Sequence, residues 1–209
     1  MKEIKVKITF TEEVLGSSPA NEDIYKDFIA SKSPDAATIE EEVAAVGVEE
    51  VTEKSMTIFP KQADGTPFVY DYQIRGFFKE MAGICKKIPH TESSKITAHK
   101  KLIDNYIFVN PRQIPLDLHG LKMGICQRPL RADTAQGPRV ALAMSETVPE
   151  GTTIEFTVVF TVDGEAGKKG KEAVDYETAL KEWLDYGKLK GFGQWRNAGK
   201  GRFNYEIIG

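Results

Sequence analysis

The chain has 209 residues, 41% of them hydrophobic and 28% charged, which is the composition of a globular protein with one or two domains. It holds no run of about 18 apolar residues, which excludes a membrane-spanning helix, and its lysine-interrupted start predicts no signal peptide. The formal net charge of −3 argues against a uniformly basic nucleic-acid-binding protein. Cys85 and Cys126 are distant in sequence, so we expect two free, buried thiols in a cytoplasmic protein.

Charge is distributed unevenly along the chain. Residues 22–53 contain ten acidic residues and two lysines, whereas residues 186–209 contain five cations and one glutamate. Residues 122–139 add four cations against one aspartate. These clusters predict one or two basic patches, although solvated surface faces give similar counts.

The N-terminal part of the chain predicts a strand followed by an acidic insertion. Residues 3–10 alternate apolar residues with lysine and threonine, the period-2 pattern of a strand with one buried face. An inserted lobe is expected at residues 20–53, with helices over residues 22–30 and 35–46.

A turn and a helix follow the insertion. Asp64-Gly65 predicts a hairpin turn between two strands within residues 54–72. Residues 73–88 have helical spacing, with a stripe of aromatic and methionine side chains that we assign to the core.

The C-terminal half predicts four strands and one helix. Residues 133–151 are expected to be loop-rich, and Asp175 is the expected N-cap of a helix that carries Trp183 on its apolar face. The strands are expected at residues 105–116, 120–130, 152–162 and 202–208. This order predicts an α+β fold of the ferredoxin-like or RRM-like type, an antiparallel sheet with helices on one face, in a single domain over residues 1–209.

The stretch GFGQWRNAGKGRF, from Gly191 to Phe203, holds four glycines, a tryptophan and three cations between a helix and the last strand. Its spacing is G-h-G-x5-G-x-G, which is neither the dinucleotide-binding fingerprint nor a P-loop. Clustered glycines indicate positive φ angles or a close approach of backbone to a partner.

This glycine-rich loop resembles the C-terminal glycine-rich loop of the RAMP superfamily, the RRM-like proteins of CRISPR systems. Residues 5–19, KVKITFTEEVLGSSP, look like the first strand of that family. Residues 72–84, YQIRGFFKEMAGI, are similar to its helix opening, with Arg75-Gly76 where many members have Leu-Lys-Gly. The resemblance implies a single-stranded RNA-binding protein of antiviral defence, most like a CRISPR effector backbone subunit that holds guide RNA. It implies partners among other CRISPR-type subunits or copies of the same chain, without cofactor, metal or membrane.

The chemistry of the loop suits this reading. Glycine amides form anion-binding nests, Trp195 can stack on an unpaired base, and the cations can pair with phosphates. The alternative is that Phe192 and Trp195 fill the core while the glycines only turn the chain. The expected RNA-binding residues are Gly191, Gly193, Gln194, Trp195, Arg196, Gly199, Lys200, Gly201 and Arg202. A second candidate set is Arg128, Arg131 and Arg139, with Gln136 beside them.

Two further hypotheses stay open. The family contains endoribonucleases, for which His119 is the best candidate general base here, although the sequence identifies no partner for it. His90 and His99 are expected on the solvated surface, and a metal-dependent variant would use a loop aspartate, Asp23, Asp27 or Asp35. The other hypothesis is a protein-interaction module of the same fold, whose acidic residues 22–53 face a basic partner.

Overall fold

A computed structural model describes residues 1–20, 56–134, 137–162 and 173–208, with side chains given outside residues 130–142. The predicted acidic lobe, its two helices and Asp23, Asp27 and Asp35 lie outside the described residues. Contacts between Cα atoms divide the chain into two compact units. The first comprises Met1–Val14, Pro60–Leu121 and Pro149–Gly209, and the second Leu15–Phe59 and Lys122–Val148.

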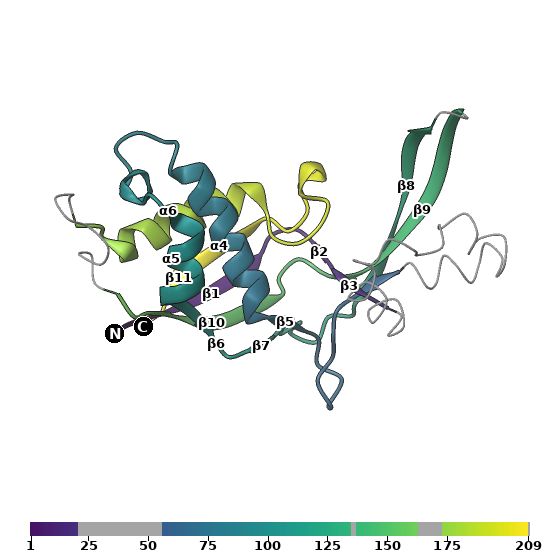
Figure 1. Cartoon of the computed structure of the whole chain (residues 1–209). Coiled ribbons are helices and arrows are strands. Elements are labelled where there is room, and N and C mark those ends of the chain that lie inside the picture. Colours follow the sequence, from purple (N-terminus) through teal and green to yellow (C-terminus); the bar gives the residue numbers. More distant parts are fainter. Residues whose placement is uncertain (21–55, 135–136, 163–172, 209) are drawn as a thin grey trace, which may run out of the picture. The chain divides into compact units, whose positions relative to one another are not determined.

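The first unit is built on a four-stranded antiparallel sheet with the order β11-β1-β10-β6 (Figure 1). Its strands are β1 (Lys2–Phe10), β6 (Ile107–Asn110), β10 (Thr153–Phe160) and β11 (Phe203–Ile207). Helix α4 (Asp71–Cys85) connects β1 to β6, and α6 (Tyr176–Lys190) connects β10 to β11. This is the βαββαβ arrangement with the fourth, first, third and second strands side by side. The predicted ferredoxin-like α+β class is therefore confirmed.

The helices cover one face of this sheet, as predicted (Figure 1). The alternating residues of β1 and β10 supply the apolar face, and Phe10 and Phe156 are each 1% exposed. Trp183 of α6 is fully buried, with its ring 5.8 Å from that of Phe78 on α4. Burying a large apolar side chain contributes about 1.5–3 kcal/mol, so this layer fixes both helices on the sheet.

Both ends of α6 are defined by local chemistry. The Asp175 carboxylate accepts hydrogen bonds from the Glu177 and Thr178 amides, so the predicted N-cap is confirmed. The hydrogen bond from the Thr178 hydroxyl also lowers the pKa of Asp175. At the other end Gly191, with φ +87°, terminates the helix. The glycine-rich loop therefore starts from a rigidly placed helix end.

A partly buried polar network fixes the middle of α6. The Glu182 carboxylate accepts hydrogen bonds from the Glu92 and Ser93 amides at 2.7 and 2.9 Å, and from the Ser93 hydroxyl at 2.6 Å. The indole of Trp183 donates to the same hydroxyl at 2.9 Å. Cys85 is buried beside Glu182, and burial raises the pKa of its thiol to about 11. Cys126 is half-buried rather than buried, and both thiols are free.

The prediction for the segment before β6 was wrong. Helix α5 (His99–Tyr106) occupies what the sequence suggested was linker and strand, and the strand starts only at Ile107. Ile103 is the one buried residue of α5, and the helix is only 8 residues long and polar on average, so the sequence resembled a linker. His99 is half-buried, and burial lowers its pKa, whereas His90 is exposed as predicted.

The second unit contains a long hairpin of β8 (Gly124–Thr134) and β9 (Gly137–Val148), joined by an 11-pair ladder. Strand β9 belongs to a sheet with β2 (Val14–Leu15), β3 (Ser18–Pro19) and β4 (Thr57–Ile58). The prediction of a loop-rich segment over residues 133–151 was therefore wrong. Gly137-Pro138 suggested a loop, but the alternation of Val140, Leu142 and Met144 follows the strand period and favours pairing with β8.

The predicted turn at Asp64-Gly65 closes a short hairpin, in which Lys61 and Pro67 form an antiparallel bridge and the Phe68 amide donates to the Pro60 carbonyl. Gly65 has φ +87°, and its amide donates to the Gln62 carbonyl. The flanking strands β4 and β5 (Phe68–Tyr70) pair with different partners, β4 with β3 and β9, and β5 with β7 (Gln113–Pro115). No helix in the described part of the chain is both long and apolar enough to cross a membrane.

Candidate nucleic-acid interface

The glycine-rich loop connects α6 to β11 and is closed by its own main chain. The Phe192 amide donates to the Gly201 carbonyl at 2.8 Å, and the Gly201 amide donates to the Glu13 carbonyl at 2.9 Å. The Gly191 amide bonds back to Gly187 of α6. These bonds pin both ends of the loop to each other and to the segment after β1.

Two glycines are explained by this closure. A Cβ atom on Gly201 would lie 1.9 Å from the Phe192 carbonyl oxygen, and one on Gly191 would lie 2.4 Å from the Lys200 carbonyl oxygen. Both distances are far below van der Waals contact. The close approach that the sequence predicts is therefore made by the loop's own backbone at these two positions.

Several amides of the loop donate hydrogen bonds within the chain. The Gly199 amide donates to the Arg196 carbonyl across a short 3-10 turn, η2 (Arg196–Ala198), and Gly191 and Gly201 donate as described above. These three glycine amides are therefore already used by hydrogen bonds within the chain. Gly193 and Gly199 adopt φ angles of +83° and +85°, the left-handed region that favours glycine.

The two aromatic residues of the loop have opposite environments. Phe192 is 7% exposed, and its ring contacts those of Phe77 and Phe10 at centroid distances of 5.8 and 6.2 Å. Trp195 is 41% exposed and adopts the left-handed conformation, with φ +54°. The alternative prediction that both residues fill the core is therefore confirmed for Phe192 and wrong for Trp195. Placing a bulky residue in this conformation costs on the order of 1–3 kcal/mol of folding free energy, so the backbone at Trp195 is strained.

Trp195 borders an open pocket of about 340 Å³. The pocket is lined by Lys190, Gly193, Gln194, Trp195, Arg196 and Asn197. Its volume is in the lower range of small-molecule sites, about 300–1,000 Å³. An aromatic face beside amide and cationic side chains suits a flat, anionic ligand, which is the chemistry of an unpaired nucleotide.

Two of the loop's three cations are paired with carboxylates. Arg196 Nη1 lies 2.8 Å from Glu80 Oε2 on α4, and Lys200 Nζ lies 2.5 Å from Glu13 Oε1. Arg202 is exposed. Sequence reasoning missed both glutamates, because Glu80 is separated from Arg196 by 116 positions and nothing in the local pattern connects them.

The second candidate set lies in the other unit. Arg128 is half-buried in β8, where it pairs in register with Ala143. Arg131 pairs with Val140, and Arg139 of β9 pairs with Ala132. The structure therefore places all three on one hairpin, while Gln136 lies outside the described residues.

His119 has the partners that the sequence did not reveal. Its Nδ1 lies 3.3 Å from Asp117 Oδ2, and its Nε2 lies 3.0 Å from the Thr153 hydroxyl. The His119 amide also donates to Asp117 at 2.8 Å. Both ring nitrogens are occupied by groups of the chain itself, so the residue ties its turn to β10. Among the described residues no group of three or more metal-ligating side chains occurs.

Comparison with known proteins identifies the fold. No family model matches the sequence, and no curated protein matches it either. A chain of a Type IV-B CRISPR complex is similar in structure, with a TM-score of 0.52 and 10% identity over 99% of this chain and 90% of that chain. The chain shares its fold with a CRISPR complex subunit. A chain of the Type III-B Cmr-beta complex bound to cognate target RNA has a TM-score of 0.49 and 11% identity, and this chain spans 61% of its length.

This fold agrees with the RAMP-like resemblance at one specific place. The resemblance implied a glycine-rich loop after the last helix and before the last strand, and α6 and β11 flank the loop in that order. The Type IV-B chain is only 10% identical, so the comparison shows a shared fold and nothing about individual residues. The role of the loop residues is therefore argued from the geometry of this chain.

Proposed function

We propose that this chain binds single-stranded RNA through the glycine-rich loop, as a backbone-type subunit of a CRISPR ribonucleoprotein. The observation that carries the proposal is Trp195, a strained and 41% exposed indole at the edge of a cation-lined pocket. Core packing does not account for this exposure, and an exposed indole face beside cations can stack on a base.

The chemistry favours an unpaired strand. A base that stacks on an aromatic side chain must expose its flat face, which bases within a duplex do not. Such stacking is worth about 1–3 kcal/mol per base and tolerates any sequence, which suits a subunit that holds guide RNAs of varied sequence. Lys190 and Arg196 line the same pocket and can meet the adjoining phosphates.

The proposal also covers the assembly in which the chain works. The similar chain belongs to a Type IV-B CRISPR complex. We extend that setting to this chain, with a cytoplasmic location and neither cofactor nor metal.

Removing the loop cations should flatten the salt dependence of RNA binding. We expect Arg196→Ala combined with Lys200→Ala to weaken binding and to reduce the salt slope by about 0.7 per lost phosphate contact. The measurement is fluorescence titration of an oligouridine at several salt concentrations.

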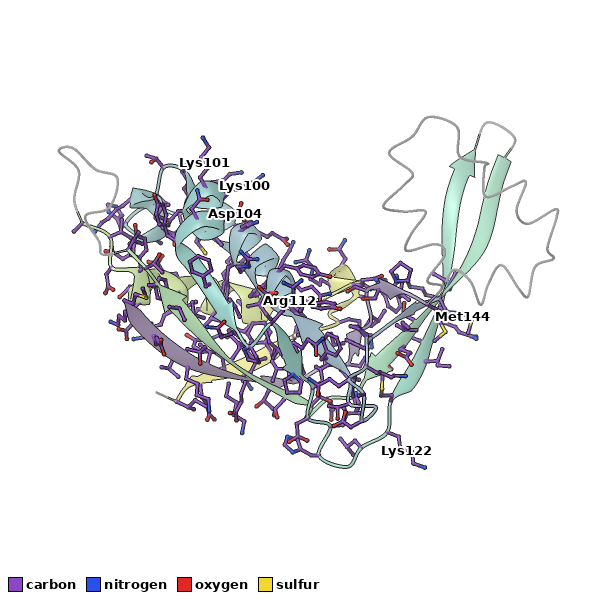
Figure 2. All side chains as sticks on the ribbon, turned by 60° about the horizontal axis from the view of Figure 1, so that its bottom comes forward. Lys100, Lys101, Asp104, Arg112, Lys122 and Met144 are labelled. Carbon is purple, nitrogen blue, oxygen red and sulfur yellow. The ribbon has the colours of Figure 1, made fainter. Side chains whose placement is uncertain are left out.

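The control for this titration removes two cations elsewhere in the same unit. Lys100 and Lys101 are exposed and point outward from α5 (Figure 2), so Lys100→Ala with Lys101→Ala deletes the same charge away from the loop. Equal slopes for the two double variants would contradict binding at the loop.

The purified chain should not cleave RNA. The chain has no histidine before His90, so none lies in the first β–α segment, where endoribonucleases of the family that the loop resembles commonly carry theirs. Asp117 and Thr153 would orient His119 as a general base, so His119 is the residue whose substitution tests this expectation. The test is prolonged incubation with structured and unstructured RNAs, with and without magnesium or manganese. Cleavage that His119→Ala abolishes would establish an endoribonuclease instead, and metal-dependent cleavage lost in Asp23, Asp27 or Asp35 variants would establish the other nuclease branch.

The protein-interaction hypothesis has a separate signature. A module that only docks onto other proteins would purify without nucleic acid, so its absorbance at the nucleic-acid maximum would be low relative to that at the protein maximum. It would also not bind oligouridine. RNA binding that depends on Trp195 excludes this alternative.

A further inference from the structure

We propose that Glu80 and Glu13 are internal competitors for phosphate, so that RNA binding exchanges a carboxylate for a phosphate at Arg196 and at Lys200. The inference rests on the proposed function and concerns the regulation of the same site. In the resting state Arg196 and Lys200 are charge-compensated, and a phosphate contact at either of them first displaces an intramolecular partner.

The geometry places one carboxylate on each of the two cations. Arg196 and Glu80 are joined at 2.8 Å, and their side chains are 26% and 39% exposed. Lys200 and Glu13 are joined at 2.5 Å, with side chains 23% and 33% exposed. All four groups reach solvent, so an incoming phosphate can approach them and a displaced carboxylate can be rehydrated.

The two pairs are not needed to place the loop. The Phe192–Gly201 and Gly201–Glu13 main-chain bonds close it, and the buried Phe192 ring anchors it to the core. Partly exposed ion pairs contribute little to folding. Their main effect is therefore on the charge that the loop presents to a ligand.

The charge pattern of the sequence overstates the basicity of this surface. Residues 186–209 contain five cations and one glutamate, but Glu80 and Glu13 arrive from distant parts of the chain and neutralise two of the five. A guanidinium has five N–H donors, so Arg196 can turn its fork to a phosphate once Glu80 is released.

The test uses glutamine variants, which keep the size and hydrogen bonding of the side chain while removing its charge. We expect Glu80→Gln and Glu13→Gln each to strengthen oligouridine binding by about two- to fivefold, the range that a surface ion pair supplies. The salt slope should stay at the wild-type value, because the same phosphate contacts form.

Glu155→Gln is the matched control. Glu155 pairs with Lys5 at 3.0 Å on the strands of the sheet, outside the loop, so this variant changes the net charge equally without releasing a loop cation. A gain in affinity no larger than that of Glu155→Gln would overturn the inference. A loss of affinity in Glu80→Gln would overturn it too, because Glu80 would then position Arg196 for binding.

Failure of this inference differs from failure of the proposed function. If RNA binding depends on Trp195 but its affinity is unchanged by both glutamine substitutions, only the exchange is refuted. If neither the wild type nor any variant binds oligouridine, both the proposed RNA-binding function and the proposed exchange are refuted. Binding that appears only in the glutamine variants would support the exchange directly.

Discussion

Replacing Trp195 with alanine should weaken binding of single-stranded RNA by about 1–3 kcal/mol, or about 5- to 150-fold, with little dependence on sequence. The indole is 41% exposed, so its removal leaves no core cavity and the melting temperature should stay close to that of the wild type. Fluorescence titration with oligouridine and oligoadenine, together with thermal unfolding, measures both effects.

Phe192→Ala is the matched control for this experiment. Phe192 lies three positions away but is 7% exposed and packed against Phe77 and Phe10. Deleting a buried phenyl ring costs about 3–5 kcal/mol of folding free energy. If Trp195→Ala instead unfolds like Phe192→Ala while the folded fraction binds RNA normally, Trp195 is a packing residue and the binding proposal loses its main support.

The parts of the fold that the sequence predicted well are those with strong local signals. Strands β1 and β10 have uninterrupted period-2 alternation, and Asp175 is followed by residues that favour a helix start. Strand β9 and helix α5 were missed for opposite reasons. Gly137-Pro138 is a strong local turn signal that the β8 ladder overrides, and α5 buries only Ile103.

The candidate site was predictable in composition but not in arrangement. Its glycines, aromatics and cations are contiguous, so the sequence identified the loop. Whether Phe192 or Trp195 faces solvent depends on backbone angles such as φ +54° at Trp195, and no local pattern encodes these. The pairing of Arg196 with Glu80 and of His119 with Thr153 depends on how distant segments pack, which is a property of the tertiary fold.

Replacing Gly201 with alanine should destabilise the first unit by about 1.5–3.5 kcal/mol, because two separate costs add. Gly201 has φ +71°, a conformation that costs an L-residue about 1–2 kcal/mol. The new Cβ atom would also lie 1.9 Å from the Phe192 carbonyl oxygen. The backbone must then separate, which breaks the 2.8 Å bond from the Phe192 amide to the Gly201 carbonyl, a loss of about 0.5–1.5 kcal/mol.

Gly199→Ala separates these two costs. Gly199 has φ +85°, but a Cβ atom there would meet only the Arg202 guanidinium, at 3.9 Å. This variant should therefore lose only the conformational term of about 1–2 kcal/mol, and urea unfolding of the two variants gives the difference. A larger loss in Gly201→Ala means that the loop is closed by direct backbone contact, and the Trp195 side chain should then lose its fixed position as well. Equal losses would show that the closure contributes nothing, and the strained, exposed setting of Trp195 would need another cause.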